Sequence, residues 1–266
     1  MAIGFIAVKN TLIHALRSAG EIQVKSFQAV KKISEKESIS SVVTEVDLES
    51  EQRIISILEK DFSQHNILSE ECGLISKASE YTWVIDPLDG TSNYAAGLPW
   101  FGVLIALMKG HNPILAGAYL PASDNLYVAE EGKGAVLNGK ILRMESREIK
   151  NTLVAFSTDF TRDEQYLQKG LDVYRYLVQH TRNVRSTNCL LDLLYVAEGR
   201  FGGCINMYTR IWDIAALYLI ITEAGGLFKS LDSSDIEFRI DEDSASKNYP
   251  ILAGNKTFME SLKAVF

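Results

Sequence analysis

Two aspartates, Asp86 and Asp89, follow a short apolar stretch in the run WVIDPLDGTSNY at residues 83–94. Pro87 restricts its own backbone and biases Asp86 toward an extended conformation, so the two carboxylates lie on a stiffened turn and can converge. Like charges this close repel unless something compensates them, and Mg²⁺ takes carboxylate oxygens as ligands. The spacing predicts a metal site, with a bare acidic surface turn as the alternative.

Gly90 and Thr91 come directly after the second aspartate. Glycine lets a backbone approach a ligand closely, and the amide groups that open a helix point toward an anion. If these two residues begin a helix, their N–H groups face the same place as the two carboxylates. The run is therefore compatible with a site that holds both cations and a phosphate.

Two other stretches place acidic residues at the end of an apolar run or at the start of one. LSEECG carries Glu70 and Glu71, for which a solvated helix cap is the alternative. WDIAALYLIITEAGG places Asp213 at the start of a predicted helix, where a carboxylate also suits the helix dipole. Trp212 before it and alanines after it indicate a tightly packed position, where a carboxylate needs a cation or hydrogen-bond donors.

Hydrophobic periodicity predicts the elements that must position these side chains. In the first half we expect helices over 3–24 and 47–62, a polar loop over 34–41, and a strand over 81–87 that stops at Pro87. Turn signals then predict an antiparallel meander over 101–140.

The second half of the chain alternates strands and helices without a clear linker. This pattern predicts one compact α/β or α+β unit built from two lobes. The predicted strands are 152–158, 202–208 and 249–254, and the predicted helices are 163–180, 188–199, 212–226 and the residues from 256 onward.

Composition excludes several classes of protein. The chain has 266 residues and a formal net charge of −7, which disfavours nonspecific nucleic-acid binding. No apolar run approaches the roughly 20 residues that cross a bilayer, so we expect no membrane span. Three cysteines without a CxxC pair support neither a disulfide framework nor a thiolate zinc site, and a cytoplasmic location is the simplest expectation.

Four separated stretches together resemble the inositol monophosphatase family, within the Mg²⁺-dependent, lithium-sensitive sugar phosphatases. WVIDPLDGTSNY is similar to the first signature of that family and WDIAALYLIITEAGG to its second, with VVTEVDLESE and LSEECG in the expected order before them. The resemblance covers nearly the whole chain. It implies a layered α-β-α-β-α sandwich like that of fructose-1,6-bisphosphatase, as one unit over 1–266 with lobes near 1–145 and 146–266.

The resemblance also implies a metal site with two or three Mg²⁺ ions. Glu70, Asp86 and the carbonyl of Leu88 would hold one ion. Asp86, Asp89 and Asp213 would hold a second. These ions would let an acidic protein accept a phosphate dianion, polarise the phosphoryl group and activate a water.

The phosphate and the attacking water have their own residues in the family pattern. Gly90 and Thr91 would bind phosphate oxygens, and Asp47 would pair with Thr91 to orient or deprotonate the water. Glu70 would take part in catalysis as a metal ligand. Lys36 lies on the polar loop that covers the site in relatives, although a loop lysine can equally be solvated.

The sequence departs from the family where the alcohol part of the substrate binds. Cys189, in VRSTNCLLDL, replaces a smaller residue, and Asn206 replaces a glutamate that contacts the sugar in inositol-preferring relatives. Both are expected to line the substrate site together with Asp89 and Asp213, and packing is the alternative role. An amide both donates and accepts, so another polyol or sugar phosphate is open as substrate.

The expected function is Mg²⁺-dependent hydrolysis of a small phosphate monoester, such as an inositol-1-phosphate-like polyol or sugar phosphate. One alternative is a fructose-1,6-bisphosphatase or a histidinol-phosphate phosphatase. A regulatory dimer that keeps the fold and binds RNA or a transcription factor is another. The resemblance implies a homodimer with no membrane partner, and nucleic acid is not an expected partner.

Overall fold

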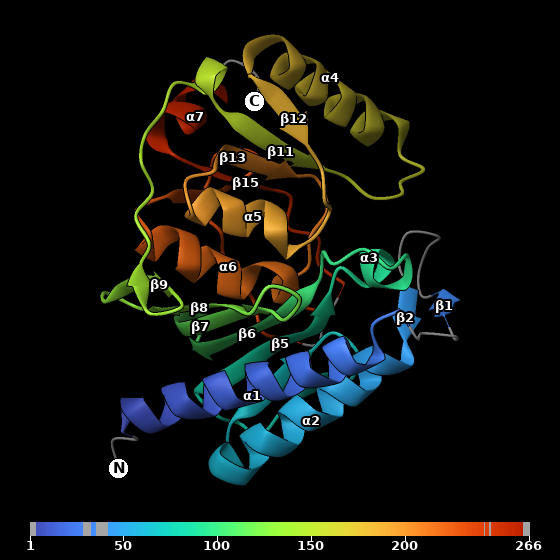
Figure 1. The fold of residues 1–266 in the computed structure, drawn as a ribbon, viewed down its shortest axis with the longest axis vertical. Coiled ribbons are helices and arrows are strands. Elements are labelled where there is room, and N and C mark those ends of the chain that lie inside the picture. Colours follow the sequence, from blue (N-terminus) through green and yellow to red (C-terminus); the bar gives the residue numbers. More distant parts are fainter. Residues whose placement is uncertain (1–3, 29–32, 36–41, 242, 245, 263–266) are drawn as a thin grey trace.

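Helices and sheets alternate in layers through the described part of the chain (Figure 1). From one side of the molecule to the other the order is helix, sheet, helix, sheet and helix, which confirms the predicted layered α+β fold. Among the described residues, no helix is both long enough and apolar enough to cross a bilayer. The computed structural model describes residues 4–28, 33–35, 42–241, 243–244 and 246–262.

The first layer is a pair of long helices, α1 (Phe5–Ser26) and α2 (Glu45–Phe62), close to the predicted bounds. Their apolar faces pack on the outer face of the larger sheet. A capping box begins α2, because the Asp47 carboxylate accepts the Thr44 backbone N–H at 2.9 Å. The cap holds Asp47 in the first turn of α2.

Eight strands form the larger sheet, and every neighbouring pair is antiparallel except β3 and β5. The predicted meander over 101–140 is confirmed as strands β6 to β10, whereas the sequence did not predict β3 and β4. Across the sheet the strands are β10 (Lys140–Ile141), β9 (Gly134–Leu137), β8 (Asn125–Glu130), β7 (Asn112–Leu120), β6 (Gly102–Lys109), β5 (Tyr81–Asp89), β3 (Asn66–Ser69) and β4 (Gly73–Ile75).

Strand β5 runs through Pro87 to Asp89, so the prediction that it stops at the proline was wrong. It pairs regularly with β6 up to Asp86, and the pairing resumes at Asp89 after an irregularity. A proline lacks the N–H that a regular ladder needs, but at an irregularity no such bond is required. The irregular segment spans residues Asp86 to Asp89. Both aspartates therefore lie together at the end of the strand.

Five strands form the smaller sheet, with β12, β11 and β13 parallel and the last two pairings antiparallel. A separate two-stranded ribbon joins β1 (Ile33–Glu35) to β2 (Val42–Thr44), so the polar loop predicted over 34–41 begins inside a strand. Across the smaller sheet the strands are β12 (Asn183–Arg185), β11 (Leu153–Ser157), β13 (Phe201–Asn206), β15 (Ile251–Gly254) and β14 (Leu227–Ser230).

Helices α5 (Leu190–Ala197) and α6 (Ile211–Glu223) lie between the two sheets (Figure 1). The largest apolar cluster joins α6 to strands of both sheets. On the far side, α4 (Glu164–His180), α7 (Lys256–Ser261) and the short helix η1 (Ile149–Asn151) cover the smaller sheet. The predicted division into lobes near residue 145 stays a prediction.

Candidate active site

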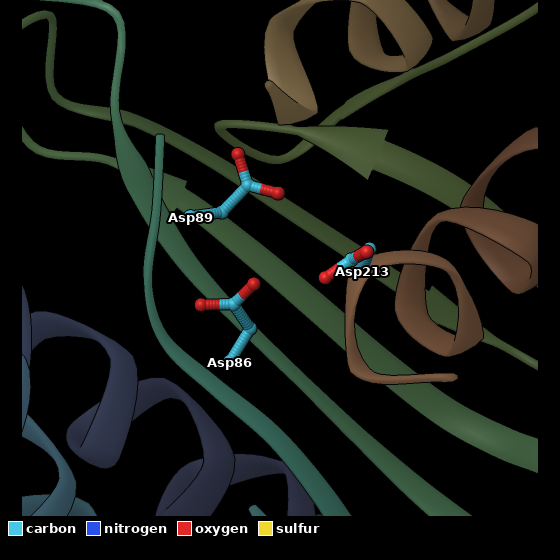
Figure 2. Close-up of side chains that lie close together, drawn as sticks. All are labelled: Asp86, Asp89 and Asp213. Carbon is cyan, nitrogen blue, oxygen red and sulfur yellow. The ribbon is translucent and has the colours of Figure 1, made fainter. Parts of the chain in front are cut away.

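Three aspartates from distant parts of the chain meet between the two sheets (Figure 2). Asp86 and Asp89 lie at the end of β5, and Asp213 lies in the first turn of α6. One carboxylate oxygen of each lies within 4.8 Å of the others. The structure therefore brings together the two predicted acidic motifs, which are more than a hundred residues apart in the chain.

Backbone N–H groups hold the three carboxylates in place. Asp213 accepts the N–H of Arg210 at 2.6 Å, in the capping arrangement that begins α6. Asp89 accepts the N–H of Leu190, the first residue of α5, at 2.7 Å. Asp86 accepts the N–H of Leu88 at 3.1 Å. The start of each central helix is thus bonded to one member of the cluster, which fixes the carboxylates before any ligand binds.

Burial and mutual repulsion make it costly for the cluster to be fully ionised. Burial raises the pKa of Asp89 to about 7, and the charges of Glu70 and Asp192 add to the rise while the Leu190 N–H opposes it. The pKa of Asp213 is raised well above its usual value by burial and then by the charges of Asp89 and Glu70. A bound divalent cation would reverse this cost, because it favours the ionised form of each carboxylate.

The residues present fit a hard divalent cation. The five predicted ligands line one pocket of about 430 Å³. Their donors are carboxylate or carbonyl oxygens, the ligands that Mg²⁺ prefers. The Leu88 carbonyl oxygen lies 2.9 Å from the Thr91 hydroxyl oxygen and has two lone pairs, so at least one of them can take an ion. Glu70 lies in the turn after β3, outside the group of three aspartates. Its charge contributes to the raised pKa of Asp213.

The start of the short helix α3 (Thr91–Ala95) borders the cluster, as the sequence predicted. Gly90 precedes it with φ of +87°, a conformation that L side chains rarely adopt, and a Cβ there would lie 2.5 Å from the Trp100 carbonyl oxygen. With five residues α3 is too short to act as an anion site through its dipole. The role of Gly90 and Thr91 in holding phosphate stays a prediction based on their place in the pocket.

Asp47 and Thr91 form the predicted pair. The Thr91 hydroxyl lies 2.9 Å from Asp47 Oδ1, and Asp47 is wholly buried. The other carboxylate oxygen of Asp47 accepts the backbone N–H and the hydroxyl of Thr44. With its proton donated to Asp47, the Thr91 oxygen has lone pairs that can accept a hydrogen bond from a water in the pocket.

The lining of the pocket also contains both predicted substrate residues. Cys189 is half-buried at the residue before α5, and its sulfur lies 3.2 Å from the Thr187 hydroxyl. Asn206 ends β13 and accepts the Tyr208 N–H at 3.0 Å through its side-chain oxygen. Their contacts with a substrate stay a prediction. Lys36 lies outside the described residues.

Sequence reasoning missed Asp159, which lines the same pocket as Asn188. Asn188 donates to Asp159 through its side-chain nitrogen at 3.0 Å and has a positive φ of 50°. Buried Asp192 holds this loop by accepting the backbone N–H groups of Thr187 and Asn188. Asp159 was detectable, because polar residues after the carboxyl end of a parallel strand often face a ligand, and it follows β11 closely.

Comparisons with known proteins agree with this geometry. The model of the Inositol monophosphatase family matches residues 7–264. The Nus factor SuhB of Pseudomonas aeruginosa is 38% identical over 233 residues, covering 85% of this chain and 86% of that protein. The fructose-1,6-bisphosphatase/inositol-1-monophosphatase of Aquifex aeolicus is 36% identical over 217 residues, covering 80% of this chain and 82% of that protein.

A solved structure shows the same arrangement of elements. The crystal structure of the extragenic suppressor protein suhB from Bartonella henselae superposes with a TM-score of 0.86 at 28% identity. The match covers 97% of this chain and 98% of that one. The likeness therefore extends over both sheets and all three helical layers.

Proposed function

Because this chain belongs to the inositol monophosphatase family, we propose that it is a Mg²⁺-dependent hydrolase of small phosphate monoesters. The observation that carries the proposal is the meeting of Asp86, Asp89 and Asp213 within 4.8 Å. We assign Glu70, Asp86 and the Leu88 carbonyl to one ion, and Asp86, Asp89 and Asp213 to a second. When bound, Mg²⁺ supplies Lewis acidity and charge neutralisation for a phosphate dianion.

The chain's own residues supply the position of the attacking water. Asp47 is fixed at the start of α2 and accepts the Thr91 proton, which turns the Thr91 lone pairs toward the pocket. The Leu88 carbonyl oxygen, 2.9 Å from the Thr91 oxygen, is the alternative acceptor for the same proton. A water that donates to Thr91 is thereby oriented toward the phosphorus, and its proton can pass through Thr91 to Asp47.

Asp159, Asn188 and Asn206 in the pocket lining favour a substrate whose alcohol part is uncharged. Asp159 would accept hydroxyl hydrogens, whereas it would repel a second phosphate. Arg210 also lines the pocket, but its guanidinium stacks 4.9 Å from the centre of the Tyr208 ring and donates to the Ser246 carbonyl. Arg210 is the only cation among the described residues that line the pocket, and these contacts hold it against protein groups. We therefore propose a polyol or sugar monophosphate and rank a bisphosphate below it.

Phosphate release from a panel of inositol, glycerol, sugar, histidinol and nucleotide phosphates tests the proposal. Activity is expected to require Mg²⁺, and Asp86→Asn and Asp213→Asn should each lower it by about a hundredfold or more, as loss of one charge-stabilising group does. Asp172→Asn, which removes an exposed carboxylate on α4, is the matched control and should be neutral. Full activity in both site variants would contradict the mechanism.

A regulatory role is the second candidate, because a relative that is 38% identical carries the name Nus factor SuhB. Arg182 and Arg185 are exposed, the first directly before the edge strand β12 and the second at its end, and they would be the contacts for RNA. The net charge of −7 opposes RNA binding at physiological salt. We expect no RNA binding by the wild-type chain. Binding that is lost in Arg182→Ala would favour the regulatory candidate.

A second copy of the chain is the partner that α4 favours. Leu167, Leu171, Tyr174 and Val178 form an exposed apolar stripe at helical spacing on α4. Asp163 and Glu164 lie at the start of α4, whereas Arg175 and His180 lie toward its end and Arg182 follows two residues after it. Two α4 helices packed antiparallel about a twofold axis would cover both stripes and place each acidic end against a basic end.

Sedimentation tests whether α4 is the interface of a homodimer. The wild-type chain should sediment as a dimer and Leu171→Glu as a monomer, because the substitution places a charge in the stripe. Val24→Glu, on an equally exposed apolar position of α1, is the control and should stay dimeric. A monomeric wild-type chain would refute the proposed interface.

A further inference from the structure

Gln23 is a buried amide directly behind the turn that carries the aspartates. It lies near the end of α1 and is 0% exposed. Its side-chain nitrogen donates to the Pro87 carbonyl oxygen at 2.8 Å. Its backbone carbonyl accepts the Tyr94 hydroxyl at 2.6 Å. The end of α1 is therefore bonded both to the turn between the aspartates and to helix α3.

The bond to Pro87 fixes one peptide unit from one side, and the cluster fixes it from the other. The peptide between Pro87 and Leu88 has its carbonyl held by Gln23 and its N–H held by Asp86 Oδ1 at 3.1 Å. A rotation of this peptide would break both hydrogen bonds together. The orientation of the Asp86 carboxylate is thus linked through a single rigid plane to the amide of Gln23.

The chemistry of Gln23 indicates that its donor is what matters. The Pro87 carbonyl is an acceptor only, so the group that faces it must be the amide nitrogen. The side-chain oxygen of Gln23 has no hydrogen-bond partner among the described residues. An apolar side chain of equal size would fill the same space without a buried unpaired acceptor. The amide therefore adds to the fold only the bond to Pro87.

We infer that Gln23 is a positioning residue for the metal site, and the inference rests on the proposed Mg²⁺ binding. By locking the Pro87–Leu88 peptide, Gln23 keeps Asp86 and the Leu88 carbonyl aimed at the ion. Without this bond the peptide can rotate, and the ligands must be reordered each time an ion binds. Groups that orient metal ligands in this way typically change metal affinity by about tenfold to a hundredfold.

Calorimetric titration of the metal-free full chain with Mg²⁺ tests the inference. In Gln23→Met, which keeps the volume and removes the donor, the dissociation constant for Mg²⁺ should rise about tenfold. Thr11→Val is the matched control, because Thr11 is also buried on α1 and its hydroxyl donates to Asp61 on α2 at 2.6 Å. It should lower the melting temperature and leave Mg²⁺ affinity unchanged.

The outcomes separate this inference from the proposed function. If the wild-type chain binds Mg²⁺ and Gln23→Met binds it equally well, Gln23 serves stability alone and the inference is overturned. If the wild-type chain binds no Mg²⁺ at millimolar concentration, the proposed function itself fails. Should Gln23→Met not fold, Gln23→Asn takes its place, because its shorter side chain keeps an amide that cannot reach Pro87. The same rise in dissociation constant is expected.

Discussion

In the absence of divalent cations, the free energy of unfolding should fall as the pH rises. The prediction follows from Asp89, whose pKa is raised to about 7 by burial and then by the charges of Glu70 and Asp192. In the unfolded chain the same carboxyl should titrate near its ordinary value of 3.8. Between these two values the folded chain holds a proton that the unfolded chain has released.

The sign and the size follow from linkage. A raised carboxyl pKa gives stability that is present below the unfolded pKa and is lost as the pH rises through the folded pKa. Three pH units at about 1.36 kcal/mol each correspond to a loss on the order of 4 kcal/mol between pH 4 and pH 8. This is an upper bound, because Asp89 faces the open pocket. Asp213, whose pKa is also raised, acts in the same direction.

Urea unfolding in the presence of a chelator, at about pH 5.5 and about pH 8.5, measures the part of this loss above pH 5.5, about 1.5 pH units or about 2 kcal/mol. The wild-type chain should lose stability at the higher pH, and Asp89→Asn should flatten the dependence, because its side-chain oxygen still accepts the Leu190 N–H without a charge. Added Mg²⁺ should restore the wild-type stability at high pH. A metal-free chain that is equally stable at both pH values, or an Asn variant with the full dependence, would refute the reasoning.

Three substitutions test other parts of the site. Gly90→Ala should destabilise the chain by roughly 2 kcal/mol or more in urea unfolding, since a Cβ there meets the Trp100 carbonyl at a positive φ; an unchanged midpoint would contradict the close approach. Thr91→Val should lower kcat by about a hundredfold because it cuts the link to Asp47; an unchanged kcat in phosphate release would remove Thr91 from the mechanism. Asp159→Asn should raise the activity on a sugar bisphosphate relative to the monophosphate, measured as a ratio of kcat/KM values. An unchanged ratio would argue against repulsion of the second phosphate by Asp159.

The acidic cluster was predictable because each of its parts is encoded locally. The spacing of Asp86 and Asp89 around a proline defines a turn, and Asp213 stands at a helix start that periodicity identifies. That the two segments meet was expected only from the resemblance to a family, because no local pattern states which distant elements pack together. The Asp47–Thr91 pair was anticipated in the same way, and its hydrogen bond is present.

What the sequence did not reveal depends on pairing across the fold. The short strands β3, β4, β12 and β14 gain their regularity from neighbours and carry little periodicity of their own. The strand was predicted to end at Pro87, because a proline interrupts a regular hydrogen-bonded ladder. In the structure the pairing of β5 with β6 is irregular at that point, and no local sequence pattern reveals this. Gln23 stands on a helix whose pattern marks the position only as inward-facing, so its bond to Pro87 has no sequence signal.

Helix α6 belongs to the core shared by both sheets and also carries the third aspartate. A cut in the chain between β10 and β11 would leave Asp86 and Asp89 on one fragment and Asp213 on the other. The ligands assigned to the first ion would stay together on the first fragment, whereas those assigned to the second ion would be divided. Binding of the second ion would then return only when the fragments reassemble, so it could report the assembly of a split form of this protein.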